Sequence, residues 1–180
     1  MASLSGVHEL TERLRSALPE VTLASQVRPG PLPARVVIAL VRRVAEQLEP
    51  VHRRRLCHGA LRPDVILVRG DQVRVTGWGL DGVAGGPWAA PELLRGEPPD
   101  PRSDVYALGA IASHALAPNQ ERDLLAAPIH LITLLECMLA RDPARRPAIA
   151  KVRAAALHIE QTSASHDDPT AVDLYAAPDE

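Results

Sequence analysis

The stretch that decides the fold is residues 57–68, which read CHGALRPDVILV. It ends in the apolar run VILV at 65–68, and a second β-like run, VRVTG, follows at 73–77. The residues between these runs, RGDQ at 69–72, have the composition of a tight turn. The sequence therefore predicts a small β-hairpin directly after a polar loop that contains a proline.

Helical segments surround this hairpin. Apolar residues recur every four positions from Pro33 to about Arg53, which predicts the longest helix of the chain. The other stretches with helical patterns are 7–18, 103–117, 129–142 and 147–160. One hairpin among many helices predicts a mainly α chain of the α+β class.

Composition disfavours several functional classes. The formal net charge is −2, which argues against a general nucleic-acid binder. Two cysteines cannot build a disulfide framework or a four-thiolate zinc site, and the seven histidines are scattered, so we expect no metal site. Apolar runs such as 129–140 are too short to span a bilayer, and Glu9 and Glu12 do not fit a signal peptide. We therefore expect a cytoplasmic protein with no membrane partner.

Five short motifs follow one another along the chain. They are HGALRP at 58–63, GWG at 77–79, APE at 90–92, SDVYALG at 103–109 and DPARRP at 142–147. In this order they resemble the C-lobe of bacterial Ser/Thr protein kinases, from the catalytic loop and the D-F-G position to the closing signature of the lobe. The resemblance covers about residues 22–158 and implies a kinase C-lobe-like fold with one small β-hairpin and no N-lobe.

The same resemblance implies that the catalytic groups are missing. The catalytic base of the family falls on Ala60, one metal ligand on Val65 and the other on Gly77. None of these side chains has an oxygen that could accept a proton or bind Mg²⁺. Residues 1–21 contain no GxGxxG loop, and the single lysine, Lys151, lies far downstream. We therefore expect a pseudokinase, not an enzyme, that uses no cofactor.

Four further residues match positions with structural roles in the family. The resemblance implies that His58 packs in the regulatory stack and that Asp104 anchors the backbone of the catalytic loop. It also implies a buried ion pair between Glu92 and Arg146, whose rupture would cost roughly 3–5 kcal/mol.

We expect three parts in the chain: an N-terminal helix replacing the N-lobe over 1–21, a C-lobe-like domain over 22–159 and a disordered acidic tail over 160–180. The tail has six acidic residues and neither Lys nor Arg. Within it, Thr170 is followed three positions later by Asp173, which resembles the phosphothreonine motif read by FHA domains. A solvated acidic tail without that role is the alternative.

These residues favour a binding or regulatory module in bacterial Ser/Thr kinase signalling. The expected partner is a protein: a Ser/Thr kinase, an FHA-domain protein or a second copy of the chain. The alternatives are a divergent kinase fragment that binds nucleotide or is completed by a partner, and a remnant fold without a task. Val65, Leu67 and Trp78 are expected near an apolar upper face, which residues 7–18, a second copy or a partner would cover.

Overall fold

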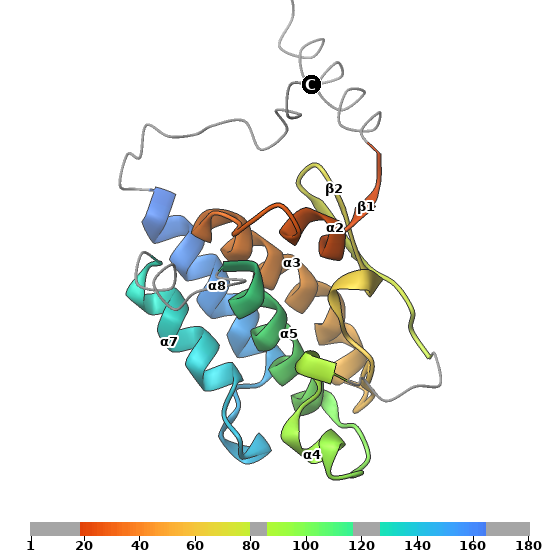
Figure 1. Cartoon of the computed structure of the whole chain (residues 1–180). Helices are drawn as coiled ribbons and strands as arrows, with labels where there is room; N and C mark the ends of the chain where they lie inside the picture. Colours follow the sequence, from red (N-terminus) through yellow and green to blue (C-terminus); the bar gives the residue numbers. More distant parts are fainter. Residues whose placement is uncertain (1–18, 80–85, 117–126, 165–180) are drawn as a thin grey trace, which may run out of the picture.

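The computed structural model describes residues 19–79, 86–116 and 127–164, which form a helical body with a small sheet at one edge (Figure 1). Its helices are α2 (Leu23–Val27), α3 (Ala34–His52), α4 (Pro91–Leu94), α5 (Pro101–Leu116), α7 (Ile129–Met138) and α8 (Ile149–Ala164). Its strands are β1 (Val21–Thr22), β2 (Ile66–Arg69) and β3 (Gln72–Val75), and its 3-10 turns are η1 (Pro63–Val65), η2 (Gly86–Trp88) and η3 (Pro143–Arg145). This architecture confirms the predicted mainly α, α+β class.

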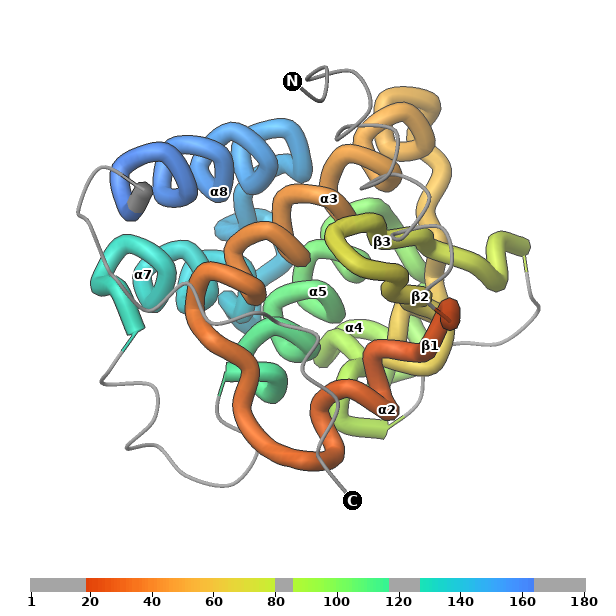
Figure 2. The backbone as a smooth tube through the Cα atoms, turned by 90° about the horizontal axis from the view of Figure 1, so that it is seen from above, coloured from red at the N-terminus to blue at the C-terminus, as the bar shows by residue number. Residues whose placement is uncertain are grey.

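The long helix α3 lies at the centre of the body. Figure 2 shows it running between α8 on one side and the β2–β3 hairpin on the other. Its apolar stripe is fully buried at Val37, Val41 and Val44, as expected for a helix that is covered along one face. Two ion pairs of 2.6 Å, Arg42–Glu160 and Arg153–Glu49, join α3 to α8 and show that the two helices run antiparallel.

The predicted hairpin is confirmed, and a third strand extends it. β2 and β3 pair antiparallel with Arg69 opposite Gln72, and Gly70 has a φ of +58°, which suits a two-residue hairpin loop. β1 pairs antiparallel with β2 and was not predicted, because two residues are too short to leave a periodic pattern. Gln47 of α3 hydrogen-bonds to the backbone of β3, on the edge of the sheet away from β2. Its Nε2 donates to the Val73 carbonyl at 2.8 Å, and its Oε1 accepts from the Val75 amide at 2.9 Å.

Helix ends differ from the predicted ones by a few residues. α7 ends at Met138 rather than at 142, and Asp142, the residue before Pro143, has the extended backbone that a following proline favours. Asp142 instead caps η3 by accepting the Ala144 amide at 2.9 Å. α8 continues to Ala164, past the expected end at 160. The predicted helix over 7–18 lies outside the described residues.

The core is almost entirely aliphatic. Its buried apolar residues in the described ranges are Leu, Val, Ile, Ala and Met, which agrees with an aromatic content of 2%. Gly109 lets α5 and α7 approach closely, since a Cβ built there would lie 2.9 Å from the Met138 Cβ. No helix in the described ranges has the length and apolar character that crossing a membrane requires.

Candidate functional site

The loop between α3 and β2 lies beside the segment that follows β3. The Thr76 amide donates to the Val65 carbonyl at 2.8 Å, and the Thr76 hydroxyl donates to the same oxygen at 3.0 Å. His58 Nε2 reaches the Thr76 carbonyl at 2.8 Å. The fold thereby brings the loop with Ala60 and Val65 next to Gly77, although these positions come from separate motifs.

His58 is buried and holds a fixed tautomer. A backbone carbonyl only accepts and a backbone amide only donates, so Nε2–H must donate to the Thr76 carbonyl while Nδ1 accepts the Ala60 amide at 3.3 Å. The indole of Trp78 lies against the imidazole, with ring centroids 4.8 Å apart. Both ring nitrogens are therefore occupied by backbone groups, and the imidazole connects the loop to the strand end.

Asp104 fixes the backbone of the loop from the first turn of α5. Its carboxylate is 1% exposed and accepts the His58 amide at 2.7 Å and the Gly59 amide at 2.8 Å. Gly59 has a φ of +76°, a left-handed conformation that favours glycine. Asp104 thereby joins the start of α5 to the backbone of the loop at two adjacent amides.

A third donor to Asp104 was not found from the sequence. His52 Nε2 lies 2.8 Å from Asp104 Oδ2 and donates to it, because an ionised carboxylate can only accept. His52 sits in the last turn of α3, at the end of the helix where basic residues are favoured. The only sequence signal was a histidine six positions before His58, which is not distinctive without the fold.

The three positions that the resemblance assigns to catalysis hold no polar side chain. Ala60 is 9% exposed and Val65 7% exposed, so both pack as apolar groups, and Gly77 has no side chain. The neighbouring carboxylate, Asp64, is largely exposed and lies 3.8 Å from Arg62. Within the described ranges, no group of three His, Cys, Asp or Glu residues could hold a metal ion.

Cys57, next to His58, is not an activated nucleophile. Burial, helped by the negative charges of Asp104 and Asp100, raises the pKa of the Cys57 thiol to about 11. The thiol therefore stays protonated at neutral pH, whereas a reactive cysteine needs its thiolate form.

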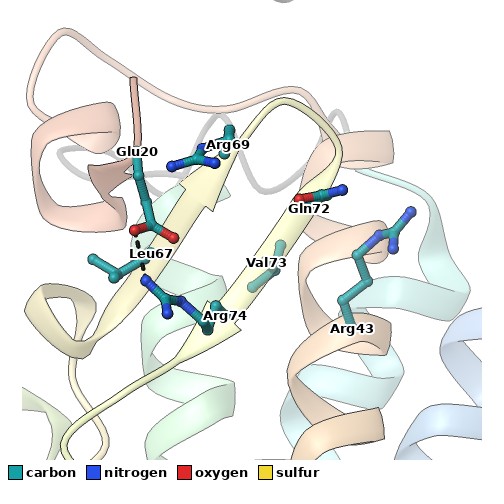
Figure 3. Close-up of a pocket in the computed structure, with 7 residues that line it drawn as sticks. All are labelled: Glu20, Arg43, Leu67, Arg69, Gln72, Val73 and Arg74. Carbon is teal, nitrogen blue, oxygen red and sulfur yellow. Dashed lines mark hydrogen bonds and ion pairs between the residues drawn. The ribbon is translucent and has the colours of Figure 1, made fainter. Parts of the chain in front are cut away.

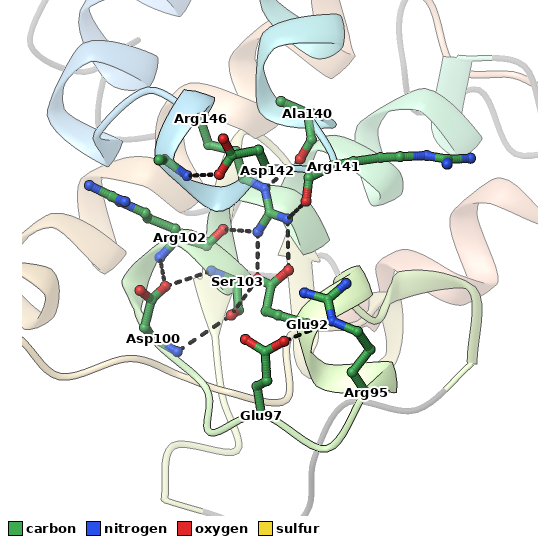
Figure 4. Close-up of polar contacts among 11 residues, drawn as sticks. Glu92, Arg95, Glu97, Asp100, Arg102, Ser103, Ala140, Arg141, Asp142 and Arg146 are labelled. Carbon is green, nitrogen blue, oxygen red and sulfur yellow. Dashed lines mark hydrogen bonds and ion pairs between the residues drawn. The ribbon is translucent and has the colours of Figure 1, made fainter.

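Glu92 and Arg146 form a buried ion pair 54 positions apart in the sequence (Figure 4). Two parallel bonds of 2.6 and 2.8 Å join the guanidinium to the carboxylate, and the Ser103 hydroxyl donates to Glu92 at 2.9 Å. The remaining bonds of the guanidinium go to the backbone carbonyls of Arg102, Ala140 and Arg141. The pair thereby ties α4 to α5 and to the loop before α8.

The carboxyl of Glu92 is ionised despite its burial. Burial by itself raises the pKa of Glu92, but the hydrogen bonds from Arg146 and Ser103 and the charge of Arg146 outweigh it, so the pKa lies below its ordinary value. The two charges neutralise one another, which makes the pair a structural connection between segments.

The outer face of the sheet combines apolar and basic side chains. Val65 is buried and Leu67 is half-buried, whereas Trp78 is 40% exposed and donates through Nε1 to the Val75 carbonyl at 2.9 Å. The strand alternation places Arg69 on the same side as Leu67, and the register places Arg74 directly opposite Leu67. This face is therefore rich in arginine. The segment 7–18, expected to cover it, lies outside the described residues.

Comparisons with known proteins point to one group of enzymes. No protein-family model matches the chain. Serine/threonine-protein kinase PknK of Mycobacterium tuberculosis is 28% identical over 68% of this chain and 14% of PknK, and PknL of that organism is 29% identical over 69% of this chain and 40% of PknL. PknF is 31% identical over 53% of this chain and 24% of PknF, so the chain spans less than half the length of each relative. These weak partial similarities support a kinase-like relationship for the chain.

Proposed function

We propose that this chain is a catalytically inactive, kinase C-lobe-like module, a pseudokinase that binds or regulates a protein partner in bacterial Ser/Thr kinase signalling. The observation that carries this proposal is a contrast between a firmly held loop backbone and the side chains at the positions in and beside that loop. Asp104 holds the loop backbone through two short hydrogen bonds, yet the positions assigned to chemistry are Ala60, Val65 and Gly77.

The chemistry of phosphoryl transfer explains why this contrast matters. The reaction needs a group that accepts the proton of the attacking hydroxyl and oxygen ligands that hold Mg²⁺ against the phosphates. Methyl and isopropyl groups supply neither function. The buried ion pair of Glu92 and Arg146, in contrast, maintains the shape of the body, and a maintained shape is what a binding surface requires.

Catalytic inactivity is tested by incubating the full chain with Mg²⁺ and radiolabelled ATP, together with casein as a general substrate. We expect no label on the chain or on casein. Label transfer by the purified chain would refute the proposal. Asp104→Ala is the control, because a contaminating host kinase would retain its activity in that preparation, whereas activity of the chain itself would fall.

A thermal shift assay with Mg²⁺ and ATP separates the proposal from the nucleotide-binding alternative. A ligand present at 100 times its dissociation constant stabilises a protein by about 2.7 kcal/mol. For a domain of this size, that corresponds to a rise in Tm of about 5–11 °C. We expect no such rise. A rise without label transfer would favour a divergent fragment that binds nucleotide.

Two experiments test the three partner types that the sequence suggests. Light scattering on the full chain reports whether a second copy binds. Mass spectrometry after incubation with an active bacterial Ser/Thr kinase reports whether Thr170 receives phosphate, with Thr170→Val as the control. Phosphate on Thr170 would support an FHA-domain partner, and its absence would count against that partner. Thr170 lies outside the described residues.

A further inference from the structure

A hollow of about 530 Å³ lies at the turn end of the β2–β3 hairpin (Figure 3). Its lining from the hairpin includes Leu67, Arg69, Gln72 and Arg74. Glu20, the residue directly before β1, also lines it. Asp104 and the loop that it anchors lie at the opposite end of the hairpin, where Thr76 follows β3. The hollow is therefore separate from the positions that resemble a catalytic site.

Two arginines share one face of the hairpin at this hollow. Arg74 stands opposite Leu67 and Arg69 stands opposite Gln72, so alternation places all four side chains on one side. Arg69 and Arg74 are then diagonal neighbours across the strands, about 7–8 Å apart at the backbone, which is within reach of two long side chains. A single anionic group between them would contact both guanidinium groups.

The charges of this hollow are not balanced. Arg74 Nη2 binds Glu20 Oε2 at 2.6 Å, but among the described residues of the lining Glu20 is the only acidic one, against Arg43, Arg69 and Arg74. Arg43 is held by Asp71, which lies outside the lining, at 3.2 Å. The lining by itself therefore has an excess of positive charge.

Arg69 is the arginine of the lining whose charge is not neutralised. Its guanidinium forms no ion pair or hydrogen bond with the described residues, and its Nε is covered by the protein without an acceptor. A charged group without a partner favours the approach of a ligand of opposite charge. Because the guanidinium is always charged, an oxyanion satisfies it better than a neutral group does.

We propose that this hollow is a binding site for the acidic side chains of a peptide, in which a carboxylate or phosphate group accepts hydrogen bonds from Arg69 and Arg74. The volume exceeds what one small anion needs and falls in the range of sites that hold larger ligands. The site is independent of catalytic inactivity, since it depends on the charges of the hairpin and not on Ala60, Val65 or Gly77.

The proposed occupant is residues 165–180 of the chain itself, and a separate acidic protein is the other outcome of the test. Residues 165–180 contain five acidic residues and neither Lys nor Arg. They follow α8, whose Glu160 binds Arg42, the neighbour of Arg43 in the lining. Tethering would give such a segment a high effective concentration at the hollow.

The test measures binding of fluorescein-labelled hexaglutamate to the full chain by fluorescence anisotropy. We expect saturable binding that Arg69→Gln weakens about tenfold or more, the effect of losing a charge-assisted hydrogen bond. Arg54→Gln is the matched control, because it removes the same charge from an exposed position at the end of α3. It should change the affinity by no more than about twofold, since screened charges far from the ligand contribute little.

Equal weakening by Arg69→Gln and Arg54→Gln would overturn the proposal, and so would an absence of saturable binding. Arg74→Gln is a second variant, expected to weaken binding in the same direction, and circular dichroism verifies that each variant is folded. The combined change Asp167→Asn, Asp168→Asn and Asp173→Asn identifies the source. Tighter probe binding by that variant would support residues 165–180 as the occupant, and unchanged, Arg69-dependent binding would refute that occupant and leave the site to a separate protein. Label transfer from ATP would refute the proposed function without altering either result.

Discussion

Removing Arg146 should destabilise the fold more than removing any exposed arginine. Arg146→Met keeps most of the alkyl chain but deletes both bonds to Glu92 and the bonds to three backbone carbonyls. It leaves the Glu92 carboxylate at 4% exposure with only the Ser103 hydroxyl as a side-chain donor. Leaving one member of a buried ion pair uncompensated costs roughly 3–5 kcal/mol.

Urea denaturation followed by circular dichroism measures this loss. A decrease of about 3–5 kcal/mol in the free energy of unfolding corresponds to a fall in Tm of about 6–20 °C for a domain of this size. Because native domains are stable by only about 5–15 kcal/mol, the variant is expected to lose a large part of its stability.

A surface pair supplies the matched control. Arg95 and Glu97 lie 2.7 Å apart but are 57% and 53% exposed, so Arg95→Met should cost less than about 1 kcal/mol. The double change Glu92→Met with Arg146→Met should cost less than the sum of the two single changes, because no buried charge is left alone. If Arg146→Met were no more harmful than Arg95→Met, the burial argument for this pair would be wrong.

Four further outcomes are expected. The pKa of Glu92 is lowered in the folded chain, so the stabilising contribution of its carboxylate is complete above the unfolded pKa of about 4.3. This contribution is lost as the pH falls through the folded pKa. Urea midpoints of wild type and Glu92→Gln should therefore converge as the pH is lowered. Gly109→Ala should lower the free energy of unfolding by up to about 2 kcal/mol, since crowding against Met138 outweighs the better helix propensity; a stabilised variant would contradict this reasoning. In a Cys137→Ser chain, alkylation of Cys57 by iodoacetamide should accelerate with pH up to about 11, whereas a plateau near neutral pH would show an activated thiol. Val65→Asn should lower the free energy of unfolding by about 1–3 kcal/mol in urea denaturation, because it buries a polar group; Val65→Ala is the comparison for lost volume. A gain of Mg²⁺-dependent ATP binding without a loss of stability would contradict this expectation.

Local signals account for the parts of the fold that the sequence predicted. The hairpin was predictable because two apolar runs flank a turn that contains Gly70, and α3 was predictable because its apolar positions repeat over 19 residues. β1 was missed because its two residues acquire strand geometry only through pairing with β2. Its position therefore depends on tertiary contact, which no local pattern records.

The contacts of the candidate site were likewise only partly predictable from the sequence. The resemblance to kinases put Glu92 and Arg146 together across 54 positions, a contact that periodicity alone could not have suggested. The resemblance did not identify the role of His52, because its contact with Asp104 depends on where the last turn of α3 ends. The sequence analysis assigned no role to Arg69 and Arg74, which alternation places beside Leu67 on the outer face of the hairpin.

The apolar residues at the loop positions are part of what holds the loop in place. Val65 belongs to the buried core, and its carbonyl accepts two hydrogen bonds from Thr76, so its side chain and its backbone join the loop to the end of β3. Ala60 is also buried, and its amide completes the hydrogen bonding of His58. A polar side chain at Val65 would need a partner that the surrounding core residues do not offer. Apolar side chains at Val65 and Ala60 therefore suit the packing of this loop, which gives a physical reason why the loop keeps its conformation.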